Sequence, residues 1–252
     1  MAPHPYLDHQ GPIAFAHRGG TSSAPENSMR AFEHAYSLGY RYLETDVHAT
    51  ADGVLVAFHD NDLERTCGIK KSIATSTWAQ IQDARIDGTD PIPTLMDIMD
   101  AWPDARLNID CKSHEALQPL IDTIHKTDCF DKVCIGSFSD KRLGAIRKEF
   151  GAKICTSMGP KEVALLLARA STRLPVPFSS PALAAQIPVN QGPIPVATQR
   201  LVRTAHRLGI AVHVWTIDDP TEIARLLDLG VDGIMSDDTM ALRDVYTARG
   251  HW

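Results

Sequence analysis

Two histidines, two carboxylates and an arginine lie within the first sixty residues, each inside a short polar motif. The motifs are AHRGG with His17 and Arg18, YLETDV with Glu44 and Asp46, and VAFHD with His59. Carboxylates hold hard divalent cations, imidazoles transfer protons near neutral pH, and a guanidinium pairs with phosphate oxygens. These residue types together predict metal-assisted chemistry on a phosphate ester.

The carboxylates have a spacing that places them on common faces of strands. Glu44 and Asp46 are two apart in a strand-like run, and Asp110 and Lys112 alternate in the same way within LNIDCK. Three carboxylates suit Mg²⁺ or Ca²⁺, and the Lys112 ammonium is suited to a phosphate oxygen. Two simpler interpretations stay open: solvated acids on an edge strand for the first pair, and an ion pair between neighbours for the second.

The two histidines are expected where strands end. His17 follows the apolar run IAFA, and His59 follows VLVAF. One such histidine is more often structural, but two predict an acid–base pair. Glu26 and Asn27 precede a predicted helix, whose N-terminus adds a weakly positive dipole. The other histidines are interpreted as surface residues, except His213, which shares a strand face with Trp215. We expect His213 to be a packing residue, with a place at the mouth of the barrel as the alternative.

Along the chain, short β-branched or apolar runs alternate with segments of helical periodicity. This alternation predicts βα units around a parallel sheet, which would position the residues named above. Strands are predicted at Ile13–Ala16, Arg41–Val47, Leu55–His59, Leu107–Cys111, Val133–Ser137, Lys153–Thr156, Ala211–Ile217 and Gly233–Ser236. Helices are predicted at Ser28–Leu38, Thr94–Ala101, Leu117–Thr127, Asp140–Glu149, Lys161–Ala170, Thr198–Leu208 and Thr221–Leu229. Eight strands in a chain of this length predict an α/β fold, a (β/α)8 TIM-type barrel, with its active site at the C-terminal ends of the strands.

Three segments depart from a regular barrel. The connection between Asp46 and Leu55 is too short for a crossover helix, so a hairpin-like irregularity is expected there. Residues 60–93 have turn signals and weak periodicity, which predicts an inserted loop or cap. Residues 174–196 carry six prolines and could include a ninth short strand. No linker divides the chain, so one barrel domain is expected over residues 1–252.

Composition narrows the classes of function and partner. A chain of 252 residues with 44% hydrophobic composition is long enough for one large core. Its net charge of −6 argues against a general nucleic-acid or anionic-membrane surface. The opening residues lack an apolar signal region, and no apolar run reaches the ~20 residues of a membrane span. Five cysteines without CxxC spacing argue against a disulfide framework or a zinc site, so a cytoplasmic location is predicted.

Taken in chain order, ten motifs resemble those of the glycerophosphodiester phosphodiesterase family. They are HRG, PEN, ETDV, GVLVAFHD, LERT, IPTL, NIDCK, GSF, VWTID and GVDGIMSD. The resemblance implies a barrel with an inserted cap that hydrolyses glycerophosphodiesters to glycerol 3-phosphate and an alcohol, with one divalent metal ion, Mg²⁺ or Ca²⁺. Residue by residue, it implies His17 and His59 as the acid–base pair, Glu44, Asp46 and Asp110 as metal ligands, Arg18 and Lys112 on the phosphate, Glu26 and Asn27 as supporting residues, and Phe138 and Trp215 as pocket walls.

The chain departs from the family pattern at two positions of interest. Asp110 stands where glutamate is usual, which leaves the choice of metal open, and Asp218 adds a negative charge where an amide is usual. The expected substrate is a small phosphodiester such as glycerophosphocholine or glycerophosphoethanolamine, bound by a monomer or homodimer without nucleic acid. Whether the nucleophile is the glycerol 2-hydroxyl or water stays open, as does which histidine is the base.

Three other functions are compatible with the same motifs. One is a lysophospholipase D activity, although residues 60–93 offer few large apolar side chains for an acyl chain. Another is a lyase that stops at a cyclic phosphate. The third is a non-catalytic barrel that binds a phosphorylated ligand.

Overall fold

Parallel strands form the wall of a barrel, in the spatial order β8-β7-β6-β2-β1-β13-β12-β9. The computed structural model describes residues 4–172 and 177–252, and a parallel bridge from Ser157 to Ala184 joins the two outer strands of this order. The strands are β1 (Ile13–Ala16), β2 (Tyr42–Ala49), β6 (Arg106–Cys111), β7 (Val133–Gly136), β8 (Cys155–Thr156), β9 (Ala184–Pro188), β12 (Ala211–Trp215) and β13 (Gly233–Ser236). The predicted TIM-type barrel is confirmed.

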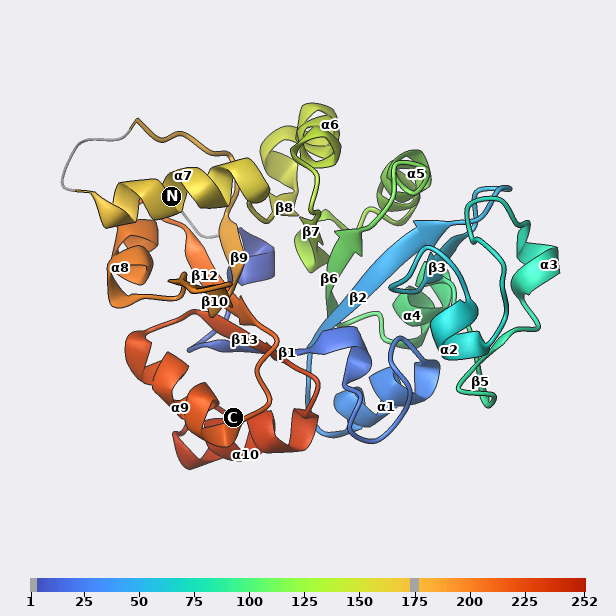
Figure 1. The fold of residues 1–252 in the computed structure, drawn as a ribbon, viewed down its shortest axis with the longest axis horizontal. Helices are drawn as coiled ribbons and strands as arrows, with labels where there is room; N and C mark the ends of the chain where they lie inside the picture. The colour runs from blue at the N-terminus through green and yellow to red at the C-terminus, as the bar shows by residue number, and fades with distance from the viewer. Residues whose placement is uncertain (1–3, 173–176) are drawn as a thin grey trace.

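A helix follows each of these strands and lies on the outside of the ring (Figure 1). The helices are α1 (Met29–Ser37), α4 (Leu95–Ala101), α5 (Leu117–Thr127), α6 (Asp140–Phe150), α7 (Pro160–Ser171), α8 (Gln199–Arg207), α9 (Pro220–Leu229) and α10 (Thr239–Ala248). Side-chain caps set several of the starts: Ser28, Asp219 and Asp238 each accept a backbone N–H from the first turn of the helix that follows. In the described ranges, no helix has the length and apolar character that crossing a bilayer requires.

The core has two parts. Most buried apolar side chains lie between the strands and the helices, where they form one continuous cluster. A smaller cluster, with Phe15, Tyr42 and Met235, lies inside the barrel, and the short helix η1 (Pro5–Leu7) adds the fully buried Tyr6 to it. The Tyr42 hydroxyl donates to the Tyr6 carbonyl over 2.7 Å. The N-terminal segment therefore packs against the start of β2, and the C-terminal ends of the strands are left for chemistry.

The segment between β2 and α4 forms an insertion beside the barrel (Figure 1). It contains β3 (Leu55–Ala57), α2 (Glu64–Cys67), α3 (Trp78–Ile81), β4 (Arg85–Ile86) and β5 (Asp90–Pro91). β3 pairs antiparallel with β2, which confirms the expected hairpin. Leu63, Ile73 and Ile81 are buried in an apolar cluster within the insertion.

Two sequence expectations about the strands and helices need correction. Leu55–His59 is not a barrel strand, because its short connection returns it antiparallel to β2. The eighth barrel strand is β9, in the proline-rich segment, whose residues 174–176 lie outside the described ones; a short hairpin of β10 (Asn190–Gln191) and β11 (Ile194–Pro195) follows it. The last helix, α10, was not predicted from the sequence.

His213 on β12 makes the stability of the fold depend on pH. The side chain is fully buried beside Phe15, and neither ring nitrogen has a hydrogen-bond partner among the described residues. Burial lowers its pKa from 6.5 to about 4. The unfolded chain therefore takes up this proton at a higher pH than the folded one, so the free energy of unfolding falls as the pH drops from 6.5 toward 4.

We expect this histidine to cost about 2 kcal/mol of stability between pH 7 and pH 5. Urea unfolding at both pH values measures the change, and His213→Leu is the control because it removes the titrating group and keeps an apolar side chain of similar size. The wild type should lose more stability than the variant over this interval. Equal losses would show that His213 does not take up a proton on unfolding.

Candidate active site

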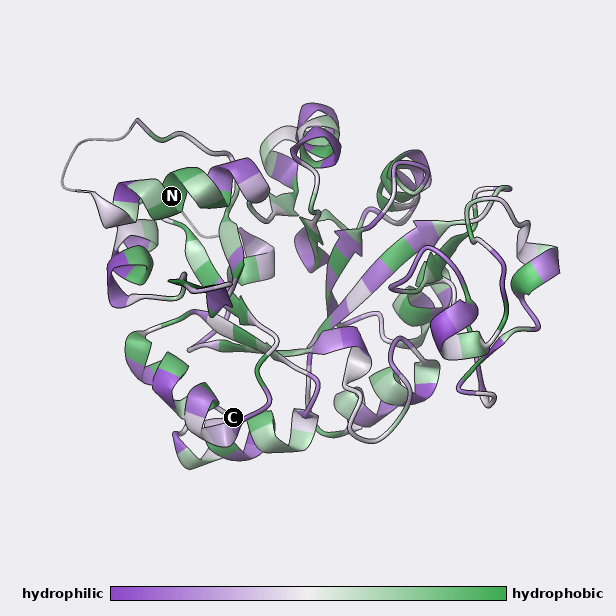
Figure 2. Cartoon of the chain, in the orientation of Figure 1, coloured by the Kyte–Doolittle hydropathy of each residue, from purple (hydrophilic) through white to green (hydrophobic). Residues whose placement is uncertain are grey.

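The predicted site residues come together toward the C-terminal end of the barrel. His17 follows β1 directly, and Asp110 lies near the end of β6. Asp46 lies opposite Asp110 in the register of β2 with β6, and Glu44 lies one pair further back on the same face. In Figure 2, β2 is banded purple and green, as expected for a strand whose polar and apolar side chains alternate.

The HRGG segment forms a tight turn that requires glycine. It begins with the short helix η2 (His17–Gly19), in which Arg18 has a φ of 52°. Gly20 has a φ of +85°, and a Cβ added there would lie 2.5 Å from Thr239 Cγ2, so a side chain is excluded. The turn directs the Arg18 backbone N–H to Glu44 Oε2 over 2.9 Å. The backbone and the side chain of this arginine thus both face the carboxylates.

Two cations neutralise part of the carboxylate charge. Lys112 Nζ lies 3.2 Å from Asp46 Oδ1 and 3.3 Å from Asp110 Oδ2. Arg18 Nε lies 3.2 Å from Asp46 Oδ2, but it is misaligned for a hydrogen bond and is buried without one. Among the described residues, this N–H is therefore a buried donor without an aligned acceptor.

The pKa values indicate that Lys112 and Arg18 do not fully compensate the negative charge of the three carboxylates. Burial, together with the charge of Asp46, raises the pKa of Glu44 to about 7. Burial also raises the pKa of Asp110, and Lys112 offsets this only in part. Burial alone would raise the pKa of Asp46, but Lys112 and Arg18 outweigh it and hold that pKa below its ordinary value. A further cation would stabilise the ionised forms of Glu44 and Asp110.

The carboxylates have the donor chemistry for a hard cation but are not assembled around a common point. Asp110 Oδ1 is buried and has no hydrogen-bond partner among the residues that the structure describes, so this acceptor is unsatisfied. Within the described ranges, however, no three His, Cys, Asp or Glu side chains are grouped as an ion site. The Lys112 ammonium contacts Asp46 and Asp110 at once, in the place where a shared cation would bind. The residue types therefore fit Mg²⁺ or Ca²⁺, provided that Lys112 moves away from one carboxylate.

Each of the two predicted catalytic histidines is held by an aspartate through Nδ1. His17 Nδ1 lies 2.8 Å from Asp237 Oδ1, and His59 Nδ1 lies 2.6 Å from Asp60 Oδ1. Because a carboxylate accepts, Nδ1 carries the proton in both, and Nε2 does not take part in these two hydrogen bonds. Burial alone would lower the pKa of His17, but Glu44, 3.8 Å from Nε2, and Asp237 outweigh it and raise that pKa.

Glu26 and Asn27 hold the residues that line the site. Glu26 Oε1 accepts a hydrogen bond from Arg18 Nη1 over 3.1 Å. Asn27 is buried; it donates to Asp46 Oδ2 over 3.3 Å and accepts from Thr45 Oγ1 over 2.8 Å. Both residues precede α1, as the sequence indicates. Glu26 is hydrogen-bonded to the side chain of Arg18, and Asn27 to that of Asp46.

An aromatic pair marks one side of the barrel mouth. Phe138 follows β7 and is 64% exposed, and Trp215 ends β12. Their ring centroids are 5.8 Å apart in an edge-to-face arrangement, and Lys112 Nζ lies 5.8 Å from the Phe138 ring centroid. The two residues thus form an apolar wall beside the cations.

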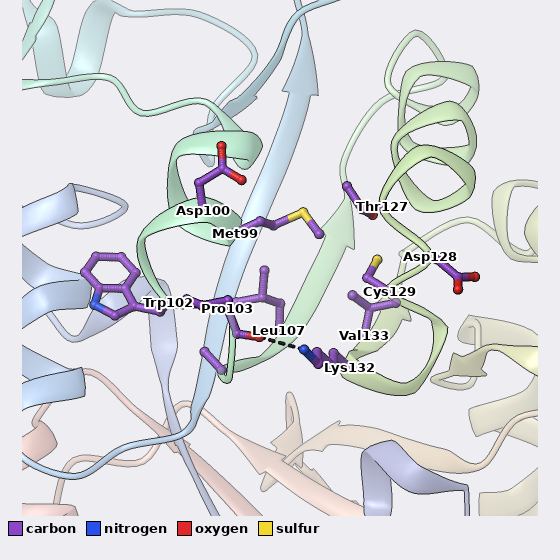
Figure 3. Close-up of a pocket in the computed structure, with 11 residues that line it drawn as sticks. Met99, Asp100, Trp102, Pro103, Leu107, Thr127, Asp128, Cys129, Lys132 and Val133 are labelled. Carbon is purple, nitrogen blue, oxygen red and sulfur yellow. Dashed lines mark hydrogen bonds between the residues drawn. The ribbon is translucent and has the colours of Figure 1, made fainter.

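A cavity of about 320 Å³ lies elsewhere, between α4 and α5 (Figure 3). It is lined by Trp102, Leu107 and Val133 among others, at the starts of β6 and β7. None of the predicted site residues lines it, and Lys132 Nζ there donates to the Pro103 carbonyl over 2.7 Å. Since active sites of these barrels lie at the opposite end of the strands, this cavity is not the active site.

Three residues of the site were not assigned a role from the sequence. Asp60 and Asp237 belong to the motifs VAFHD and GVDGIMSD, but the motifs do not say which histidine each one holds. His48 was expected at the surface, which is wrong: it is buried, and its Nε2 lies 3.1 Å from the His59 carbonyl. Its position on β2, two residues beyond Asp46 and on the same face, was the available signal.

Comparison with known proteins gives one consistent result. A sequence profile described as the Glycerophosphoryl diester phosphodiesterase family matches residues 17–241. A probable glycerophosphodiester phosphodiesterase of Mycobacterium tuberculosis is 40% identical over 98% of this chain and 95% of its own length. A lysophospholipase D of Rattus norvegicus is 26% identical over 91% of this chain and 84% of its own. The structure of an Oleispira antarctica phosphodiesterase with the product sn-glycerol-3-phosphate has a TM-score of 0.78 at 20% identity and covers 94% of this chain and 97% of its own.

Proposed function

Because the chain belongs to the glycerophosphoryl diester phosphodiesterase family, we propose that it hydrolyses glycerophosphodiesters to glycerol 3-phosphate and an alcohol. The observation that carries this proposal is the pair of histidines, His17 and His59, each held by an aspartate through Nδ1 beside buried carboxylates and two cations. The phosphodiesterase from Oleispira antarctica, which has the same fold, was crystallised with sn-glycerol-3-phosphate, the product proposed here.

Arg18 and Lys112 are the proposed contacts of the phosphate. Arg18 Nε is a buried donor without a hydrogen bond, and Lys112 Nζ lies between two carboxylates near the mouth of the barrel. Both cations would neutralise the negative charge that grows on the non-bridging oxygens in the transition state. The Phe138 and Trp215 rings are proposed to wall the pocket on the side of the leaving alcohol.

The two histidines are the proposed acid and base. One takes a proton from the nucleophile through Nε2, and the other gives a proton to the leaving alkoxide. The glycerol 2-hydroxyl and water can both serve as the nucleophile with this pair; the first route passes through a cyclic phosphate that water then opens. In either case, the aspartates keep Nδ1 protonated and stabilise the imidazolium that forms.

A single divalent cation, Mg²⁺ or Ca²⁺, is proposed to be held by Glu44, Asp46 and Asp110. The support is the partnerless Asp110 Oδ1 and the raised pKa values of Glu44 and Asp110. When bound, such an ion supplies positive charge to a phosphoryl oxygen. Lys112 would then keep one of its two carboxylate contacts and turn toward the substrate.

The insertion disfavours a lysophospholipid as substrate. Its large apolar side chains Ile73, Ile81 and Ile86 are buried in the insertion's own cluster, so they are not available to line a groove for an acyl chain. We expect release of glycerol 3-phosphate from glycerophosphocholine or glycerophosphoethanolamine, and at least about tenfold slower choline release from lysophosphatidylcholine.

A coupled glycerol 3-phosphate assay and ³¹P NMR of the products measure both rates. Preferred cleavage of lysophosphatidylcholine would reassign the enzyme as a lysophospholipase D. A cyclic phosphate as the final product would make it a lyase. Binding of the substrate without turnover would leave a phosphoryl-binding barrel.

A further inference from the structure

Arg65 in the insertion donates from each of its three guanidinium nitrogens to one of two carboxylates. It lies on α2, within the motif LERT, for which the proposed reaction supplies no role. Nη1 and Nη2 donate to the two oxygens of Glu26 over 3.0 and 2.6 Å, and Nε donates to Asp60 Oδ2 over 2.5 Å. Such a planar fork of donors is specific to arginine, since the lysine ammonium is a single point charge.

Both carboxylates also hold a residue of the candidate active site. Asp60 Oδ1 lies 2.6 Å from His59 Nδ1, and Glu26 Oε1 accepts from Arg18 Nη1. One continuous chain therefore runs from Arg18 through Glu26, Arg65 and Asp60 to His59. Its two ends are the proposed phosphate contact and one of the proposed acid–base residues.

The local fold fixes Arg65 at the junction of this chain. Leu63, which precedes α2, is fully buried in the cluster of the insertion, and Gly68 ends the helix in the left-handed conformation. Burial alone would raise the pKa of Asp60, but the hydrogen bonds from Arg65 and His59 lower it to about 2. Asp60 is therefore ionised near neutral pH, where it accepts from His59.

We propose that Arg65 is a positioning residue of the reaction, which orients His59 through Asp60 and Arg18 through Glu26. This inference rests on the proposed function, because it assigns Arg65 to the same phosphodiester cleavage. The insertion would then contribute directly to the active site: with α2 in place, the chain of hydrogen bonds aligns Arg18 at one end and His59 at the other. The competing role is structural, in which Arg65 only fastens the insertion to the barrel.

Arg30 provides a matched control for that structural role. Its guanidinium also joins the barrel helices to the insertion with two hydrogen bonds to one carboxylate, Nε to Asp90 Oδ1 over 3.2 Å and Nη2 to Asp90 Oδ2 over 2.6 Å. Among the described residues, no side-chain hydrogen bond or ion pair joins Arg30 or Asp90 to a proposed site residue. Arg30→Lys therefore weakens the attachment of the insertion without breaking the chain from Arg18 to His59.

The first readout is kinetic. We expect Arg65→Lys to lower kcat by about 10- to 100-fold, because misplacement of a catalytic group by about 1 Å costs up to about 100-fold. Arg30→Lys should stay within about twofold of the wild type. Adding Arg65→Lys to Asp60→Asn should cost less than Arg65→Lys alone, since the link to His59 is already broken. Equal kcat for wild type and Arg65→Lys, or additive losses in the double variant, would overturn the inference.

The second readout needs no activity. The imidazole ¹⁵N resonances of His59 should shift in Arg65→Lys, because the Nδ1–H bond to Asp60 changes, whereas those of His17 should not, because Asp237 holds it independently. Unshifted His59 resonances in a folded variant would overturn the role of Arg65. If the wild type releases no glycerol 3-phosphate while His59 still shifts, the proposed function has failed, and with it the assignment of Arg65 to that reaction.

Discussion

Replacing either His17 or His59 with alanine should lower kcat for glycerophosphodiester cleavage by about two to four orders of magnitude. In the proposed mechanism, each variant loses a group that transfers a proton in the transition state. The pairing with Asp237 or Asp60 holds each imidazole in one orientation. Release of glycerol 3-phosphate at saturating substrate is the measurement. His125→Ala is the control, since His125 also pairs with a carboxylate, Glu149, but lies on α5 away from the site.

The melting temperatures of all three variants should stay close to that of the wild type, so that a loss of rate is not a loss of fold. Turnover near the wild-type rate for both His17→Ala and His59→Ala would refute the acid–base assignment. A substrate with a p-nitrophenol leaving group separates the two roles, because its departure needs no proton. The variant that lacks the acid should recover most of its rate with this substrate, and the variant that lacks the base should not.

The barrel was predictable because its signal is repeated along the chain. Each βα unit consists of a short β-branched run followed by an amphipathic helix. An error at a single position therefore does not change the number of units that the sequence predicts. β9 gave a weaker signal: the prolines around it indicated an irregular segment that could include a ninth short strand, and that strand is present as the eighth of the barrel. The misplaced eighth strand, Leu55–His59, shows that hydrophobic alternation predicts a strand without predicting its neighbour or its direction.

The faces of the site residues were predictable, but their partners were not. Alternation placed Glu44 with Asp46 and Asp110 with Lys112, whereas only the register of β2 with β6 sets Asp46 opposite Asp110. Asp237 is 220 residues from His17, and barrel closure brings the two together. β1 pairs with β13 so that Ala16 lies opposite Ser236, and the next residue on each strand is then His17 and Asp237. The contact between His17 and Asp237 therefore requires both the closure of the barrel and the register of β1 with β13. The sequence motifs carry information on neither.

Lys112 is a second case in which the sequence describes a residue without its geometry. Its motif places it on the face of Asp110, which is correct, but the ammonium also contacts Asp46 on the neighbouring strand. Two acids and one lysine in contact can be a complete ion network or a metal site that lacks its ion. A divalent cation that displaces Lys112 from one of the two carboxylates distinguishes the metal site from the ion network.

Removal of divalent cations should lower the rate of glycerol 3-phosphate release by at least about 100-fold, and Mg²⁺, Ca²⁺ or Mn²⁺ should restore it. The reason is electrostatic: Lys112 and Arg18 satisfy Asp46, but Glu44 and Asp110 keep raised pKa values and Asp110 Oδ1 has no partner. The measurement is the assay after chelation and again with each ion, with the melting temperature recorded at each step.

Asp110→Asn gives the matched test of the carboxylates themselves. The amide keeps the shape of the side chain and removes its charge, so the variant should need a higher concentration of the ion for half-maximal rate and should show a smaller rise of melting temperature when the ion is added. Asp110→Glu should retain the response, with a different order of preference among the three ions. A wild-type rate that chelation leaves unchanged would instead mean that Lys112 and Arg18 alone neutralise the phosphate, and that the carboxylates serve to hold those two cations.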